Sequence, residues 1–447
     1  MKQSVDESLE ALIREVKEKL SSHREIAEVF DRCYRNTMQK TVERLEDGTT
    51  YVITGDIPAM WLRDSTAQMR PYLILAAGNE EMADIIEGLI KRQVACIHID
   101  PYANAFNREA NGACWEQDET LRNDWVWERK YEIDSLCYPV QLMYLFWKVT
   151  NRTKFFDLSI KKALEKIIQV FRIEQNHEEK SEYSFIRKNT FFTDTLSRGG
   201  KGALVKPGIG LTWSGFRPSD DACTYGYLIP SNMFAVVILG YMEEIAEVIY
   251  NDTVLMQEAN ELKREIKAGI ENFGITAKEG YGNVYAYEVD GFGQFNLMDD
   301  ANVPSLLSME YLGYQPERKE VVENTRKLIL SEANPYYYEG CKASGIGSSH
   351  TPVGYIWHIS LAMEGLTTKD KNKKLSILKK MVETDGDTEF MHESFNPDNP
   401  REYTREWFSW ANALFCELVL EYCGYTICNT NPSLKPLKNL QKYQRFF

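Results

Sequence analysis

The stretch GDIPAMWLRDS, residues 55–65, concentrates side chains that could do chemistry. It sets Asp56, Trp61, Arg63 and Asp64 directly before an apolar, helix-like run. Carboxylates and an arginine can hydrogen-bond hydroxyl groups in bidentate fashion, while an indole face packs against apolar ring faces. This combination predicts a pocket for an uncharged, polyhydroxylated ligand such as a sugar.

The same mixture of aromatic, acidic and turn-forming residues recurs along the chain, each time ahead of an apolar run. The segments that carry it are 114–132, 215–227, 291–302, 345–352 and 390–408. The apolar runs begin near Asp64 and then cover 133–150, 229–250, 303–313, 354–366 and 409–424. Ser, Asp or Asn stands near the start of most of them, as expected for helix N-caps.

More charged, amphipathic helix candidates alternate with these apolar runs. They cover 24–40, 79–98, 153–173, 253–273, 316–332 and 368–384. Fully apolar helices need cover on every side, whereas one-sided helices face solvent on the other. The alternation therefore predicts an inner ring wrapped by an outer ring, an (α/α)6 barrel formed by a single domain over 1–447. A superhelical solenoid of helix pairs is the structural alternative.

Two Gly-rich segments, 202–216 and 281–295, interrupt this pattern and predict minor β-hairpins or long loops on the barrel rim. In a closed ring, the segments before the inner helices meet at one end and form a mouth. We expect carboxylates and aromatic rings to dominate this mouth, which would hold Asp56, Trp61, Arg63, Asp64, Trp115, Glu116, Asp118, Trp213, Asp220, Asp221, Asp299, Asp300, His350, His392, Glu393 and Trp407.

Such a mouth could support glycoside hydrolysis. The reaction needs one protonated carboxylic acid at the leaving oxygen and one ionised carboxylate that activates water or attacks carbon. Burial among aromatic rings would raise the pKa of the first group, and neighbouring donors would hold the second ionised. At least eight carboxylates compete for these two roles, and their spacing does not choose between them.

Composition argues against several other classes of protein. The net charge is −14 and no dense Lys/Arg run occurs, so nucleic-acid binding is not expected. No uninterrupted apolar stretch reaches membrane-spanning length, and the amphipathic N-terminus lacks the apolar core of a signal peptide. The six histidines and nine cysteines show no zinc motif, and no nucleotide-binding motif is present. Scattered cysteines favour reduced thiols and a cytoplasmic location.

Four blocks together give a specific resemblance: GDIPAMWLRDS, RPSDDACTYGYLIPSNMF, LMDDANVPSLL and MHESFNPDNP. The chain resembles glycoside hydrolase family 125, the bacterial and fungal exo-α-1,6-mannosidases, over nearly its whole length, and most closely the clostridial type. The resemblance implies an (α/α)6 barrel that inverts the anomeric centre without a metal or other cofactor. It implies that Asp220, in PSDD, is the general acid and that Glu393, in MHES, is the general base. Its substrates would be mannosides and N-glycan-derived oligosaccharides with terminal α-1,6-linked mannose.

The remaining candidates each have a structural alternative. We predict contacts with the sugar from Asp56, Trp61, Arg63, Asp64, Trp115, Asp221, Asp300, His350 and His392. Asp64, Asp220, Asp221 and Asp300 could instead be helix caps, and the tryptophans could be rim packing. Glu393 could pair with Arg401 or Arg405, and His392 could merely orient Glu393.

Three rival functions remain open at this point. Another inverting barrel glycosidase, of the glucoamylase or trehalase type, would use the same two carboxylates, whereas a phosphorolytic enzyme would want an anion pocket in place of Glu393. A terpene or prenyl enzyme would also have an aromatic cavity, but DDACT and DDANV lack the third aspartate of a DDxxD motif. A non-catalytic sugar-binding module would bind the ligand without turnover.

Overall fold

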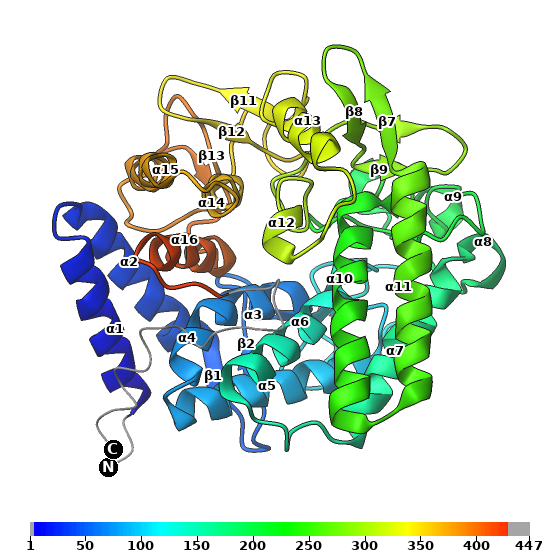
Figure 1. Cartoon of the computed structure of the whole chain (residues 1–447), viewed down its shortest axis with the longest axis horizontal. Helices are drawn as coiled ribbons and strands as arrows, with labels where there is room; N and C mark the ends of the chain where they lie inside the picture. Colours follow the sequence, from blue (N-terminus) through cyan, green and yellow to red (C-terminus); the bar gives the residue numbers. More distant parts are fainter. Residues whose placement is uncertain (1–3, 428–447) are drawn as a thin grey trace.

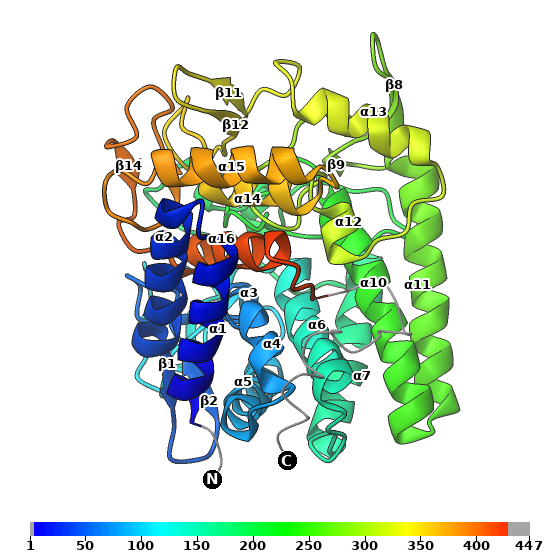
Figure 2. The same cartoon turned by 60° about the vertical axis from the view of Figure 1, so that its left-hand side comes forward.

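Helices dominate the computed structural model, which describes residues 4–427 (Figure 1). The inner helices surround the centre in chain order: α3 (Leu62–Met69), α6 (Ile133–Thr150), α10 (Ile229–Ile245), α12 (Met309–Leu312), α14 (His358–Leu366) and α16 (Ser409–Tyr422). The outer helices are α1 (Val5–Lys19), α2 (Arg24–Asn36), α5 (Glu80–Ile99), α7 (Leu158–Glu174), α11 (Thr253–Phe273), α13 (Lys319–Ile329) and α15 (Lys371–Glu383). Figure 2 shows α15 along the outside of α14.

Contacts between the inner helices close the ring. Helix α3 packs on α6, α6 on α10 and α10 on α12, while α14 packs on α16 and α16 returns to α3. The last inner helix therefore touches the first, which an open solenoid would not allow. The predicted (α/α)6 barrel is confirmed.

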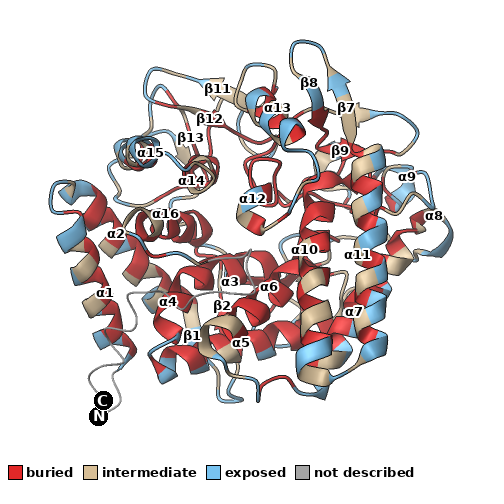
Figure 3. Cartoon of the chain, viewed as in Figure 1, coloured by how far each residue is buried: buried red, intermediate tan, exposed pale blue. Residues whose placement is uncertain are grey.

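Burial follows the apolar pattern of the sequence. Every residue of α6 from Ile133 to Trp147 is buried, because this helix is covered by the ring on one side and by outer helices on the other. The outer helices expose one face, as Figure 3 shows for α11, and the exposed face of that helix carries Glu258, Glu261, Arg264 and Glu265. Their first turns carry the expected caps, since Asn79, Asp157, Asp252 and Asp370 accept backbone N–H groups at the starts of α5, α7, α11 and α15.

The fourth inner helix is much shorter than predicted. We expected a helix over 303–313, but only Met309–Leu312 is helical. The Asp299 carboxylate accepts the backbone N–H groups of Leu306 and Leu307 at 2.8 and 2.9 Å, and Pro304 has no N–H to give. The side chain thus replaces the backbone acceptors that a helix would have supplied.

Short elements complete the chain between the long helices. The short helices are α4 (Leu73–Ala76), α8 (His177–Lys180) and α9 (Ser197–Gly200), with 3-10 turns at Arg70–Tyr72 and Phe192–Asp194 and π-helical turns at Thr37–Thr41 and Ala246–Tyr250. The strands are β1 (Val42–Arg44), β2 (Thr50–Val52), β3 (Met60–Trp61), β4 (Ala105–Phe106), β5 (Val126–Glu128), β6 (Tyr227–Leu228), β7 (Ile275–Lys278), β8 (Gly282–Tyr285), β9 (Glu288–Val289), β10 (Phe295–Asn296), β11 (Tyr337–Glu339), β12 (Ser344–Ile346), β13 (Ser394–Phe395) and β14 (Tyr403–Thr404).

These strands pair antiparallel in small sheets. The orders are β3-β4-β5 and β10-β9-β6, and β7 pairs with β8. Segment 281–295 therefore does contribute short strands, whereas 202–216 is irregular, in keeping with the predicted rim loops. Within the described residues, no helix is both long and apolar enough to cross a membrane.

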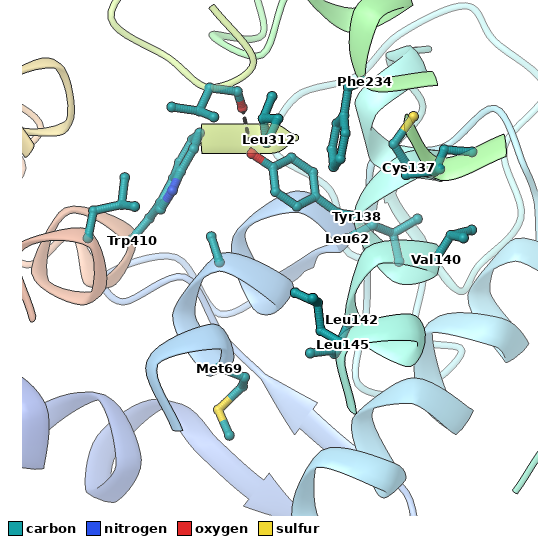
Figure 4. Packing of buried hydrophobic residues seen from close by; sticks show 14 of the residues in the cluster. Leu62, Met69, Cys137, Tyr138, Val140, Leu142, Leu145, Phe234, Leu312 and Trp410 are labelled. Atoms are coloured by element: carbon teal, nitrogen blue, oxygen red, sulfur yellow. Dashed lines mark hydrogen bonds between the residues drawn. The ribbon is translucent and has the colours of Figure 1, made fainter. Parts of the chain in front are cut away.

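Tyr138 of α6 ties the centre of the ring together. Its ring points toward the barrel axis, near Phe234 of α10, Leu312 of α12 and Trp410 of α16 (Figure 4). Its hydroxyl donates to the Val303 carbonyl at 2.9 Å, at the start of the irregular segment that stands in for the fourth helix. One buried tyrosine thus links an inner helix to the segment across the axis.

We expect Tyr138→Phe to destabilise the protein by about 1–3 kcal/mol, because the buried Val303 carbonyl would lose its donor. Urea unfolding followed by circular dichroism measures the change. Tyr250→Phe is the matched control, since it removes a hydroxyl-to-carbonyl bond of 3.0 Å at the surface. A cost for Tyr138→Phe no larger than that of the control would contradict the role assigned to this bond.

Candidate active site

The segments that lead into the inner helices meet at one end of the barrel. Backbone hydrogen bonds join them pairwise: Asp56 N to Trp407 O at 3.2 Å, Ala301 N to Gly347 O at 3.1 Å, and Ile356 N to Phe395 O at 2.9 Å. Gly215 N donates to Tyr131 O at 3.1 Å in the same way. Residues far apart in the sequence therefore share one rim, as the barrel requires.

Arg63 is the centre of this rim. It lies at the start of α3 with only 3% of its surface exposed, and its Nη1 lies 2.6 Å from Glu132 Oε2 and 3.5 Å from Asp134 Oδ2. Its Nη2 lies 3.5 Å from Asp220 Oδ1, and its Nε lies 3.2 Å from Asp64 Oδ1. Asp64 and Asp134 occupy the first turns of α3 and α6, where the helix dipole favours an anion.

Burial and Arg63 have opposite effects on the pKa values of these carboxyl groups: burial raises them and Arg63 lowers them. It raises the pKa of Glu132 well above its usual range and that of Asp134 to about 6, even though Arg63 opposes both shifts. It also raises the pKa of Asp64. Asp220 goes the other way: burial would raise its pKa, but Arg63 and Lys130 outweigh burial and lower it.

Asp220 stands on a tight turn before α10. Its φ is +67°, an uncommon conformation for a residue with a side chain, and its N–H donates to Arg217 O at 2.9 Å. Lys130 Nζ donates to its backbone carbonyl at 2.8 Å, and Asn104 Nδ2 donates to Oδ1 at 3.2 Å. About a fifth of the side chain, 22%, stays exposed, so the carboxyl can reach a ligand.

Glu393 stands on the opposite part of the rim, before α16. Thr404 Oγ1 donates to its Oε2 at 2.9 Å, and Arg405 Nη1 lies 3.7 Å from its Oε1. Strand β13 directly follows it and pairs with β14, which brings Thr404 to the carboxylate. Arg405 in turn bonds both carboxylate oxygens of Asp56, so the opening motif of the sequence braces the Glu393 side of the rim.

His350 connects the two sides. Its Nδ1 lies 3.1 Å from Asp221 Oδ1, and Ser349 Oγ donates to Asp221 Oδ2 at 2.5 Å. Burial alone would lower the pKa of His350, but Asp221, Glu393 and Asp220 raise it to about 9, so the imidazole is protonated at neutral pH. Asp221 is thus the carboxylate in contact with His350, and the charges of Glu393 and Asp220 raise the pKa of His350 further.

The other predicted site residues occupy different positions. Trp61 is buried against Ala59 and Ala105, with its indole N–H unpaired, whereas Trp115 is 56% exposed. Asp300 is buried, and Asn302 donates to its Oδ1 while Ser348 donates to its Oδ2.

Two predictions for the mouth need revision. Trp213 is completely buried and stacks on His177 at 3.6 Å between ring centres, so it belongs to the core and not to the mouth. Asp299 caps the backbone of Leu306 and Leu307, as described above, and is fully buried.

His392 and His358 hold the loop that carries Glu393. Both ring nitrogens of His392 lie near protein oxygens, Nδ1 at 3.1 Å from Arg405 O and Nε2 at 3.0 Å from Asp385 O. The backbone N–H of His392 donates to His358 Nδ1 at 3.0 Å, and His358 Nε2 lies 3.3 Å from Thr384 Oγ1. This geometry makes His392 a support for its neighbour Glu393.

Sequence reasoning missed Glu132, Lys130 and Arg405. Glu132 and Lys130 end the aromatic-acidic segment before α6, which is one of the segments expected to form the mouth, and that membership was the available signal. Arg405 was considered only as a partner that would make Glu393 structural. Within residues 4–427, no group of three or more His, Cys, Asp or Glu side chains is arranged to hold a metal ion.

Comparison with known proteins gives consistent matches. The sequence profile of a family described as metal-independent alpha-mannosidase (GH125) matches residues 23–420. A Schizosaccharomyces pombe protein named meiotically up-regulated gene 157 protein is 38% identical over 435 residues, covering 93% of this chain and 85% of that protein.

Solved structures agree with the sequence matches. A Streptococcus pneumoniae structure from a new family of metal-independent alpha mannosidases, in a non-productive complex with alpha-1,6-mannobiose, is 50% identical with a TM-score of 0.92, covering 95% of this chain and 99% of that one. A bacterial glucoamylase complexed with acarbose is 13% identical with a TM-score of 0.53, covering 83% of this chain and 50% of that one, and shares the fold alone.

Acid should loosen the loop that carries Glu393. Burial, and then the neighbouring His392, lower the pKa of His358 to about 3 from its ordinary 6.5. A histidine whose folded pKa is depressed contributes stability above its unfolded pKa and loses it as pH falls toward the folded value. At pH 5 the loss from His358 reaches about 2 kcal/mol.

Denaturant unfolding at pH 7.5 and pH 5, compared between the wild type and His358→Asn, measures this effect. The variant keeps a group that can hydrogen-bond but does not titrate, so its drop between the two pH values should be smaller by about 2 kcal/mol. Thr384→Val removes a partner of the ring while keeping the imidazole, and should keep a wild-type pH dependence. An unchanged drop in His358→Asn would contradict the assignment.

Proposed function

The chain belongs to the GH125 family of metal-independent α-mannosidases, and from this premise we propose that it is an inverting exo-α-1,6-mannosidase. Its substrates would be mannosides and N-glycan-derived oligosaccharides that end in α-1,6-linked mannose. The 50% identical S. pneumoniae protein, whose structure holds alpha-1,6-mannobiose, supports the sugar and the linkage. The whole chain, 1–447, would act as one catalytic domain.

One observation carries the mechanistic part of the proposal. Asp220 and Glu393 stand on loops before α10 and α16, on two sides of one rim, and the charges of both raise the pKa of His350. Neither is sealed off, since 22% of the Asp220 side chain and 10% of the Glu393 side chain remain exposed. Carboxyl groups placed on two sides of a cavity can flank a sugar and a water molecule together.

We assign the acid step to Asp220 and the base step to Glu393. Asp220 would protonate the glycosidic oxygen as the bond to C1 breaks, and Glu393 would take a proton from the water that attacks C1 from the opposite face. An inverting pair needs about 6.5–9.5 Å between the carboxyl groups to admit that water. Thr404 and Arg405 would aim Glu393 at the water, because their contacts fix its two oxygens.

The wall of the pocket for the terminal sugar would come from the opening motif. Asp64 Oδ1 forms an ion pair with Arg63 but accepts no well-aligned hydrogen bond, and the indole N–H of Trp61 donates none, so both would bind hydroxyl groups of the sugar. His350 would donate from the far side, with Asp221 holding it. Asp56, Asp300 and His392 would hold other groups in place, while Trp115, at the exposed rim, would stack on the rest of the oligosaccharide.

We also propose a cytoplasmic location. The eight cysteines among the described residues are all free, and five of them are buried. Free thiols in this number are typical of a reducing compartment.

Proton NMR of α-1,6-mannobiose hydrolysis tests the proposed function directly. An inverting enzyme should release β-mannose first, and α-mannose should accumulate only as the product mutarotates. An initial α-mannose signal would contradict the roles of Asp220 and Glu393. No hydrolysis of this disaccharide would contradict the linkage.

Glu393→Gln should reduce kcat by about 10²–10⁴-fold, because the water would lose its base. Glu406→Gln is a matched control, since this exposed residue lies on the same rim segment and should keep wild-type activity. Steady-state kinetics on α-1,6-mannobiose gives both values. Full activity in Glu393→Gln would remove this residue from the mechanism.

A further inference from the structure

Glu132 has one carboxylate oxygen that nothing in its surroundings accounts for. The residue is 1% exposed, and its Oε2 accepts from Arg63 Nη1 at 2.6 Å and from Ser135 Oγ at 2.7 Å. Its Oε1 is equally buried but receives no hydrogen bond from any donor. A buried carboxylate oxygen without a donor is costly unless it carries a proton itself.

The neighbour that could accept such a proton is Asp220. Arg63 holds both carboxyl groups, with Nη1 2.6 Å from Glu132 Oε2 and Nη2 3.5 Å from Asp220 Oδ1. Two carboxyl groups can share a hydrogen bond only when one of them is protonated. Asp134, the other acid of this segment, contacts Arg63 and Ser231 instead.

The charges around Arg63 also require a retained proton. From α3 and α6, Arg63 faces Asp64 and Asp134; from the segments before α6 and α10 it faces Glu132 and Asp220. Lys130 is the second nearby cation, but it also pairs with Asp194 and Glu128. Four buried carboxylates against these cations would leave negative charge uncompensated, which favours protonation at Glu132 or Asp134, the two fully buried side chains.

We propose that Glu132 stores the proton that Asp220 delivers to the leaving group, so that the acid of the reaction is a carboxyl pair. The proposal rests on the assignment of Asp220 as general acid. It resolves a conflict in the site, because Arg63 and Lys130 hold Asp220 ionised while its task requires a proton. Glu132 is a positioning residue that acts through Asp220, since its own side chain is fully buried whereas 22% of the Asp220 side chain is exposed.

The proton held by Glu132 reaches the leaving group through Asp220. The proton leaves Glu132 Oε1 for the Asp220 carboxylate, and the proton on Asp220 goes to the glycosidic oxygen as the C1–O bond breaks. The attacking water forms a new bond to C1 and gives its proton to Glu393. Each turnover leaves the carboxyl pair short of one proton and Glu393 with one extra, and solvent water restores both.

The dependence of kcat on the leaving group distinguishes a Glu132 that delivers a proton from a Glu132 that only supports the structure. We would compare α-1,6-mannobiose, whose sugar alkoxide must be protonated, with 2,4-dinitrophenyl α-mannoside, whose phenolate leaves without a proton. Glu132→Gln should lower kcat on mannobiose by about 10²–10³-fold and on the dinitrophenyl substrate by less than about 5-fold. The alkaline limb of its pH profile should move to lower pH by about one unit, because the proton would have to reside on Asp220 alone.

Equal losses on the two substrates, with an unmoved alkaline limb, would overturn the proposal. Asp134→Asn is the comparison variant: it removes a second carboxyl group from Arg63 but leaves both Glu132 and Asp220 in place, so its loss on mannobiose should be smaller than that of Glu132→Gln. If Glu132→Gln does not fold, Glu132→Asp keeps a proton-bearing group in a displaced position. It should lose activity on mannobiose preferentially, and equal losses there would overturn the proposal as well.

Asp220→Asn distinguishes this proposal from the proposed function. A loss confined to mannobiose in Asp220→Asn, with equal losses in Glu132→Gln, would keep Asp220 as the acid and reject Glu132 as its proton store. Equal losses on both substrates in Asp220→Asn would reject the acid assignment itself, and the role of Glu132 with it.

Discussion

Arg63 is a single buried guanidinium that four carboxyl groups approach, and the rest of the site depends on this arrangement. Its three nitrogens contact Asp64, Glu132, Asp134 and Asp220 at 2.6–3.5 Å. A guanidinium remains charged at any working pH, so the cluster cannot neutralise itself by losing the cation. It can do so only by retaining protons on acids, which is the chemical requirement for a general acid at neutral pH.

The barrel makes this crowding possible. The long inner helices α6, α10 and α16 are apolar on nearly all sides, so most polar residues of the site gather where the chain leads into the inner helices. Ring closure then brings these segments together, and backbone hydrogen bonds such as Asp56 N to Trp407 O lock them in register. On the Glu393 side, Thr404 donates to Oε2 and Arg405 lies 3.7 Å from Oε1. Asp220 instead shares Arg63 with three other carboxyl groups, so only its side of the rim carries an excess of acids.

Much of this architecture could be predicted from the sequence. Apolar runs need burial on every side and amphipathic runs on one side only, so their alternation predicts an inner and an outer ring of helices. The clearest failure among the helices, 303–313, came from Asp299, whose carboxylate replaces backbone acceptors in a way no periodicity reveals. Trp213 was expected in the mouth because it lies in the Gly-rich segment 202–216, for which rim loops were predicted. In the structure, glycines let the backbone pack closely on its buried ring. A Cβ atom at Gly226 would lie 2.3 Å from the Trp213 ring. The catalytic roles assigned to Asp220 and Glu393 from their motifs remain predictions. Glu132 was overlooked because only the folded chain shows that Arg63, Glu132 and Asp220 lie together.

The proton on the carboxyl pair can be located directly. Neutron diffraction from crystals of the ligand-free enzyme grown at neutral pH in deuterated water would show which carboxyl groups carry deuterium. The account predicts deuterium on Glu132 Oε1, directed at Asp220, with Glu393 unprotonated. Four bare carboxylates around Arg63, or a deuterated Asp220 beside an ionised Glu132, would contradict it.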